Sequence, residues 1–86
     1  MEMYHRIQSV KPSGELTFDA LFLNGEIRRY DVRPLIERWP VFRALRDVPG
    51  LFGLVHVDAG GYAVAWNDEL DLECETVWEE GTVPAL

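Results

Sequence analysis

The sequence has little from which to build a framework held by disulfides or metal ions. Its 86 residues include one cysteine, so no disulfide can form within the chain, and two histidines leave little for a metal site. Every apolar run is shorter than the roughly 18 residues of a membrane span, and residues 1–6 lack the apolar segment of a signal peptide. These absences predict one small cytoplasmic domain without a metal or cofactor, held together by its core or by a second copy.

Positive charge is missing from the second half of the chain. Residues 1–47 hold eight Lys and Arg against seven acids, a formal charge of +1, whereas residues 48–86 hold eight acids and no Lys or Arg, a charge of −8. Either the arginines partly neutralise the acids inside the fold, or an acidic face meets a basic partner. Duplex nucleic acid is disfavoured as that partner, because phosphate binding needs a basic surface.

Turn signals and periodicity divide the chain into short elements. Strands are expected over 1–10, 15–23, from 26 to about 32, 51–58 and 62–66, with short helices from about 34, over 41–46 and from about 71 to 80. This order predicts an α+β domain over 1–86 with one small antiparallel sheet of about five strands: two hairpins plus an N-terminal strand. Short helices lie between the hairpins and at the C-terminus, and the tail from about 82 to 86 is expected to fray.

Asn24-Gly25 predicts a hairpin with a two-residue type I′ turn, in which Leu21 faces Arg28. One face of the hairpin would then carry Phe18, Ala20, Phe22 and Ile27, and the other would carry Leu21, Leu23, Tyr30 and Val32. A hairpin that is apolar on both faces is either sandwiched or covered by a second subunit, so a homodimer is predicted. The same register places Arg29 and Asp31 on the Phe18 face, a conflict that a β-bulge near Arg28 would remove.

Gly60-Gly61 predicts a second hairpin, in which Val57 faces Val64. Beyond it the periodicity becomes helical, with an apolar stripe at Leu70, Cys74, Val77 and Trp78. Asp71 is the expected N-cap of this helix and Gly81 its end.

A set of local motifs resembles one known family. They are Asn24-Gly25-Glu26, Tyr30-Asp31-Val32 before Pro34-Leu35, Phe52, Gly60-Gly61, Trp66, and Asp71-Leu72 ahead of Trp78. In this order they resemble the small bacterial domain of unknown function 2442. The resemblance implies a small bacterial α+β protein without known catalytic residues. It also implies that some members are encoded beside a small partner protein, in arrangements like toxin–antitoxin pairs.

Few residue groups could carry chemistry. His56 and Asp58 share one face of a predicted strand and could ligate a metal or form a base with an orienting carboxylate, but no third group accompanies them. Cys74 is expected to be buried and inert among acids. Arg28, Arg29 and Arg33 form a basic cluster around Tyr30 that could bind single-stranded nucleic acid or serve as a solvated charged face.

These features favour a non-enzymatic protein-interaction module, the acidic and antitoxin-like member of a two-gene pair that binds a basic protein partner. The alternatives are a nucleic-acid-associated accessory domain that uses the arginine cluster, and a small enzyme or metal-binding domain around His56 and Asp58. The candidate interaction surface comprises Leu21, Leu23, Tyr30, Val32, Arg28, Arg29 and Arg33. The positions expected to be structural are Asn24, Gly25, Trp66, Asp71 and Trp78.

Overall fold

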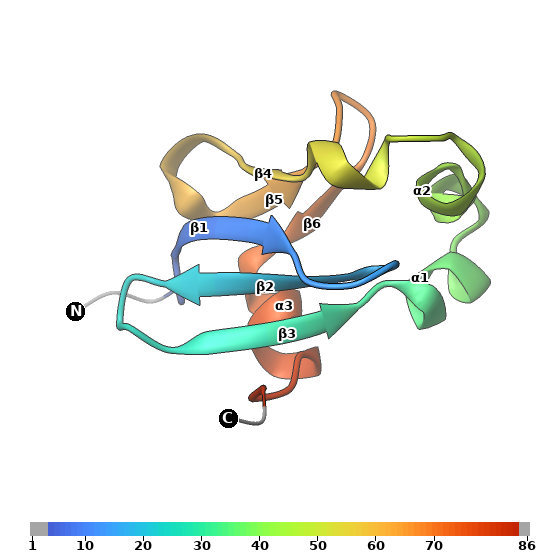
Figure 1. The fold of residues 1–86 in the computed structure, drawn as a ribbon. Helices are drawn as coiled ribbons and strands as arrows, with labels where there is room; N and C mark the ends of the chain where they lie inside the picture. The colour runs from blue at the N-terminus through green and yellow to red at the C-terminus, as the bar shows by residue number, and fades with distance from the viewer. Residues whose placement is uncertain (1–3, 85–86) are drawn as a thin grey trace.

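Two small antiparallel sheets and a set of short helices make up the computed structural model, which describes residues 4–84 (Figure 1). The first sheet has the order β1-β2-β3, with β1 at Ile7–Pro12, β2 at Thr17–Phe22 and β3 at Ile27–Asp31. The second has the order β4-β5-β6, with β4 at His56–Val57, β5 at Ala63–Ala65 and β6 at Asp71–Glu73.

Helical segments connect the two sheets and end the chain. Between β3 and β4 lie α1 at Arg33–Arg38, the 3₁₀ helix η1 at Pro40–Arg43, α2 at Ala44–Asp47 and the 3₁₀ helix η2 at Phe52–Leu54. The short 3₁₀ helix η3 at Ala59–Gly61 joins β4 to β5, and α3 at Cys74–Glu80 follows β6 directly. In Figure 1, α3 lies behind β2 and β3, and α1 and α2 extend the molecule to one side.

The α+β class is confirmed, but the single sheet of about five strands is wrong. The chain forms two sheets of three strands each. Within the expected strand over 51–58, residues 52–54 form the 3₁₀ helix η2, and only His56–Val57 form a strand, β4. The expected strand over 1–10 begins at Ile7 and continues to Pro12, and its first three residues lie outside the described part of the chain.

The register of the first hairpin differs from the prediction by one residue. Leu21 pairs with Ile27 instead of Arg28, because the loop has three residues and not two. Gly25, at φ +91°, donates its N–H to the Phe22 carbonyl, and Phe22 in turn donates to Glu26. This arrangement is a type I turn closed by a glycine bulge. The bulge predicted near Arg28 is absent, because the pairing of β2 with β3 is continuous there; the phase is set instead by the bulge at Gly25 in the turn.

The shifted register reverses which side chains of β3 face inward. Tyr30 and Val32 are buried in the core, while Arg29 and Asp31 lie on the outer face. The expected face of Leu21, Leu23, Tyr30 and Val32 is therefore split between the two sides of the sheet. The outer side keeps Leu21 and Ile27, and Leu23 is exposed in the turn. The homodimer remains a prediction, but Tyr30 and Val32, two of the four residues that supported it, are buried in the core.

The second hairpin has the predicted register, with Val57 opposite Val64. Its loop is longer than the two residues predicted. The hydrogen bond nearest the loop runs from the Asp58 N–H to the Ala63 carbonyl. Gly61 has φ +81°, and a Cβ at that position would lie 2.5 Å from the Ile7 carbonyl oxygen. The missing side chain lets this turn lie against the backbone at the start of β1.

Asp71 is not the N-cap of the last helix. It pairs with Ala65 as the first residue of β6, a strand that the helical periodicity concealed. The helix begins three residues later, with Glu73 at the N-cap position and no side-chain cap bond. Gly81 ends the helix as expected. Thr82 does not fray, because it exchanges two backbone hydrogen bonds with Arg29 on the edge of β3.

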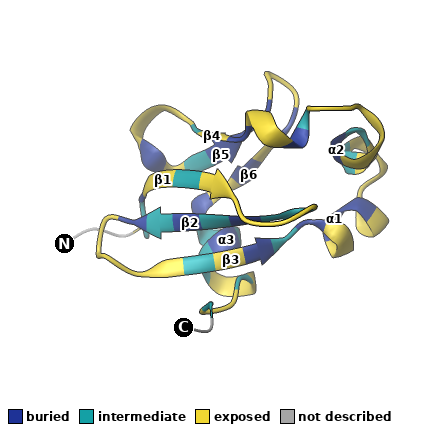
Figure 2. Cartoon of the chain, in the orientation of Figure 1, coloured by how far each residue is buried: buried dark blue, intermediate teal, exposed yellow. Residues whose placement is uncertain are grey.

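The core lies between the first sheet, the second sheet and α3, with alternate residues of β2 buried against it (Figure 2). Trp66 is central to this core. Its ring lies 6.0 Å from Phe18 of the first sheet, 6.5 Å from Phe42 of η1 and 6.1 Å from Phe52 of η2. One indole therefore joins the end of β5 to the other sheet and to the helical connection.

Replacing Gly61 with alanine tests how closely the second hairpin packs against β1. Gly61→Ala adds a Cβ at a positive φ and beside the Ile7 carbonyl, so we expect a loss of about 1–3 kcal/mol in the free energy of unfolding. Urea titration followed by tryptophan fluorescence measures it. Gly53→Ala is the matched control, because a Cβ there meets no atom within 4 Å. Equal stability of the two variants would contradict the close approach.

Candidate functional site

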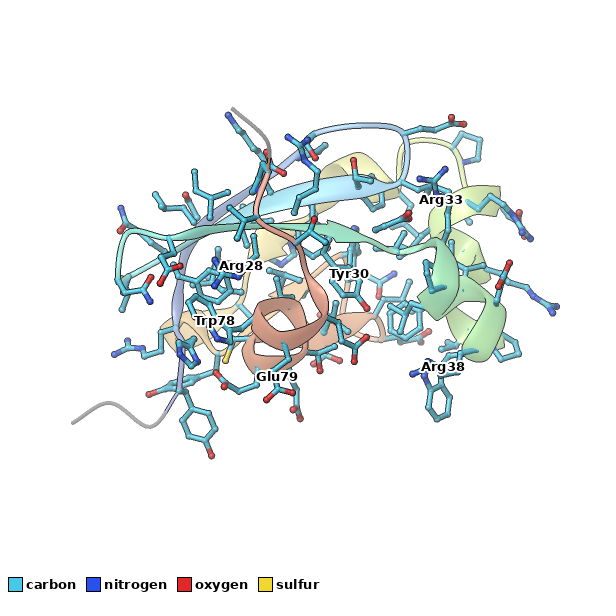
Figure 3. All side chains as sticks on the ribbon, turned by 90° about the horizontal axis from the view of Figure 1, so that it is seen from below. Arg28, Tyr30, Arg33, Arg38, Trp78 and Glu79 are labelled. Carbon is cyan, nitrogen blue, oxygen red and sulfur yellow. The ribbon has the colours of Figure 1, made fainter. Side chains whose placement is uncertain are left out.

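The arginines expected to form one basic cluster point to different parts of the surface. Arg28 lies on the inner side of β3 beside Trp78, whereas Arg33 lies at the start of α1 (Figure 3). Arg29 points to the outer face, because successive residues of a strand alternate in direction. The tertiary structure therefore separates side chains that the sequence places within six positions.

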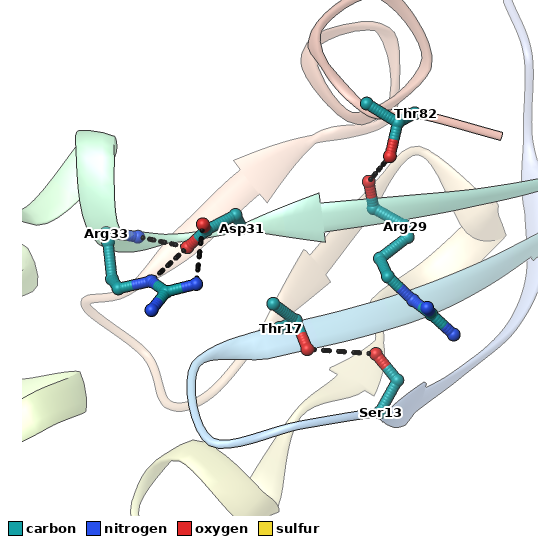
Figure 4. Close-up of polar contacts among 6 residues, drawn as sticks. All are labelled: Ser13, Thr17, Arg29, Asp31, Arg33 and Thr82. Atoms are coloured by element: carbon teal, nitrogen blue, oxygen red, sulfur yellow. Dashed lines mark hydrogen bonds and ion pairs between the residues drawn. The ribbon is translucent and has the colours of Figure 1, made fainter. Parts of the chain in front are cut away.

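Each of these guanidinium groups already has an acidic partner. Arg33 binds Asp31 through two nitrogens at 2.9 Å, and Arg29 binds Asp19 across the strands at 2.8 and 3.0 Å (Figure 4 shows the first pair). The arginine hydrogen bonds lower the pKa of both carboxyl groups. These arginines thus act as counter-ions within the fold, which weighs against a free phosphate-binding cluster.

Arg28 is part of a stack built on Trp78. Its guanidinium carbon lies 3.8 Å from the centroid of the indole, and it also pairs with Glu26 at 3.1 Å. The His5 ring is stacked on the same indole at 3.9 Å, with the two planes only 7° apart. Since two groups this close cannot share one face of a ring, Trp78 is sandwiched between them. Trp78, expected to face inward, is partly buried against Phe22 of the core and also anchors the N-terminal segment to α3.

Glu75 fixes the other side of His5. Its carboxylate accepts the backbone N–H of His5 at 2.6 Å and lies 3.0 Å from the ring nitrogen Nδ1. The hydrogen bond from the His5 backbone N–H lowers the pKa of Glu75, and the hydrogen bond with the His5 ring lowers it further. The segment before β1 is therefore held to the first turn of α3 by a charged carboxylate and an aromatic stack.

His56 and Asp58 each have a local structural partner. The His56 ring nitrogen Nδ1 lies 2.9 Å from the carbonyl oxygen of Leu54, and the Asp58 carboxylate caps η3 by accepting the N–H of Ala59. Within residues 4–84, no group of three His, Cys, Asp or Glu side chains is placed to hold a metal ion. The pair thus has local roles in ending η2 and starting η3.

Cys74 and Tyr30 are titratable groups within the core. Burial raises the pKa of the Cys74 thiol, and the neighbouring Glu75 raises it further, as the acidic surroundings predict. Burial, followed by the charge of Glu80, raises the pKa of Tyr30 to about 12. Neither group is activated as a nucleophile or base near neutral pH.

An acidic surface does form on the outer side of the second sheet. Asp58, Ala63 and Glu73 lie in one row across the strands, and His56, Ala65 and Asp71 in the next. The row between them, Val57, Val64 and Leu72, faces the core. We call the outer residues Asp58, Ala63, Ala65, Asp71 and Glu73 the acidic sheet face. Ala63 is half-buried and Ala65 is buried at its centre, and its three carboxylates are exposed at the sides.

The acidic sheet face adjoins a pocket lined by two tyrosines and two carboxylates. It lies between Tyr4, Tyr62, Glu73, Cys74 and Glu75. The two tyrosine rings meet edge to face, with centroids 5.8 Å apart. The Tyr62 carbonyl accepts the N–H of Cys74 at 2.9 Å, so the turn before β5 is tied to the start of α3. Sequence reasoning missed this pocket because its residues come from three distant segments.

The fold and the site define a small α+β domain with an acidic sheet face and paired arginines. None of the helices within residues 4–84 is long and apolar enough to span a bilayer. The chain belongs to the family DUF2442, described as a protein of unknown function, whose model matches residues 7–82. This confirms the resemblance carried by the local motifs. None of the curated proteins and none of the solved structures compared with the chain matches it.

The contact between Glu75 and His5 predicts a pH-dependent contribution to stability. Because the folded pKa of Glu75 lies below its ordinary value of 4.5, the contribution is present above that pH and is lost as the pH falls through the folded pKa. We expect the wild type to lose more stability than Glu75→Gln between about pH 5 and pH 3. Urea titrations at several pH values measure the difference.

Glu69→Gln is the control for this prediction, because Glu69 is exposed in the turn between β5 and β6. It should retain the pH dependence of the wild type. If Glu75→Gln retained it as well, the carboxylate would not hold the N-terminal segment.

Proposed function

We propose that this domain is a non-enzymatic protein-interaction module whose acidic half binds a basic protein partner. The main support is the distribution of ion pairs. Arg28, Arg29, Arg33 and Arg46 pair with acids at positions 19–47, from their own half of the chain. None of these four ion pairs uses an acid of the C-terminal half, where Asp71 and Glu73 are exposed to an external cation.

The arrangement of the acids supports the same proposal. Asp58, Asp71 and Glu73 surround two alanines on the acidic sheet face, and Asp68 and Glu69 lie exposed in the adjoining turn. Exposed carboxylates gathered on one side of a sheet can attract a basic segment of another protein. The resemblance to gene pairs of the toxin–antitoxin type adds the finer proposal that this partner is encoded nearby and is restrained by binding.

The candidate nucleic-acid function has weaker support. It depends on Arg28, Arg29 and Arg33, which lie on different parts of the surface and are engaged by Glu26, Asp19 and Asp31. These carboxylates partly compensate the guanidinium charges, which weakens their attraction for a phosphate.

Co-expression with the product of the adjacent gene tests the proposed function. We expect a complex whose affinity falls steeply between about 0.1 and 0.5 M salt, because exposed charges are screened. The double variant Asp71→Asn and Glu73→Gln should weaken it about three- to tenfold, mainly through the association rate. Affinity and rates are measured by surface plasmon resonance.

The matched control is Glu15→Gln with Glu37→Gln, which removes two exposed acids from the other half of the chain. It should bind within twofold of the wild type. A complex that does not form, or that both double variants weaken equally, would refute an interaction through the acidic half.

A further inference from the structure

The pocket between Tyr4, Tyr62, Glu73 and Glu75 combines the two kinds of group that recognise a guanidinium. Aromatic faces attract cations through their π electrons, and carboxylates form charge-assisted hydrogen bonds with them. Tyr4 and Tyr62 are 52% and 46% exposed, so part of each ring is accessible to another molecule. Glu73 makes no cap bond to α3, which leaves its carboxylate available on the surface.

The domain already makes this type of contact within itself. The guanidinium of Arg28 is held between the indole of Trp78 at 3.8 Å and the carboxylate of Glu26 at 3.1 Å. Arg6 lies 5.1 Å from the ring centroid of Tyr62 and donates to the carbonyl of Gly60. Both examples use the planar group of arginine, which can stack on a ring and hydrogen-bond at its edge at the same time.

Contacts within the fold already bring the walls of the pocket together. Gly61 packs against Ile7, which brings Tyr62 beside the segment that carries Tyr4. Glu75 holds that segment through the N–H of His5. A preformed site loses less freedom on binding than a mobile one, so a modest number of contacts can give specificity.

We propose that this pocket binds an arginine side chain of the partner. This assignment rests on the proposed function and adds to it the type of side chain that is bound. Glu73 belongs both to the pocket and to the acidic sheet face. A basic segment lying along the exposed carboxylates of the acidic sheet face would therefore reach the pocket at the end of β6. The tyrosines select the planar guanidinium, and the surrounding carboxylates hold the flanking basic residues.

Titration of the full chain with a short arginine-containing peptide, followed by ¹H–¹⁵N NMR, tests the assignment. We expect the largest shifts at Tyr4, Tyr62 and Glu73, and weaker binding of the peptides in which lysine or citrulline replaces arginine. Tyr4→Ala should weaken binding of the arginine peptide about two- to fivefold. Tyr4→Phe should bind like the wild type, because the ring and not the hydroxyl is used.

A second pair of variants separates the pocket from general acidity. Glu73→Gln should weaken binding about two- to fivefold, whereas Glu69→Gln, the same charge change in the adjoining turn, should leave it within twofold. Equal losses in these two variants, no effect of Tyr4→Ala, or equal binding of the lysine peptide would overturn the arginine pocket and leave the acidic interaction surface intact. If no basic peptide binds and the co-expressed partner does not associate, the pocket and the proposed function both fail.

Discussion

The whole fold depends on the burial of Trp66 between two sheets that are too small to be stable alone. Its contacts with Phe18, Phe42 and Phe52 join the second sheet to the first and to the helical connection. The indole N–H is buried without a hydrogen-bond partner in the described structure, which costs about 1–3 kcal/mol. The apolar area of the ring and its aromatic neighbours offsets that cost, because burying such a ring is among the largest contributions to a core.

This core determines what the surface can present. With Val57, Val64 and Leu72 facing inward, strand alternation directs Asp71 and Glu73 outward. The first sheet does the same for Arg29, which meets Asp19 on its outer face. The charge asymmetry of the chain therefore survives folding. Arg28, Arg29, Arg33 and Arg46 pair with acids near their own positions, and Asp58, Asp71 and Glu73 lie together on a separate surface.

Local signals in the sequence were sufficient where turn chemistry and periodicity agree. Gly60-Gly61 and the valines around it predicted the register of the second hairpin, and Gly81 predicted the end of α3. They failed where two local solutions compete. Asn24-Gly25 suits both a two-residue turn and a three-residue turn with a bulge, and packing of Tyr30 against Phe18 accompanies the second. Asp71 suits a helix cap, but pairing with β5 satisfies its backbone in a strand.

The sequence by itself determined the α+β class, the family, the positions of most turns and the acidic character of residues 48–86, because these follow from composition and from neighbours along the chain. The tertiary structure alone decided which face each β3 residue occupies, which acids the arginines engage, and that Tyr4, Tyr62 and Glu73 surround one pocket. Those outcomes depend on contacts between distant segments. A shift of one residue in register reverses the faces of a strand, and no local pattern specifies it uniquely.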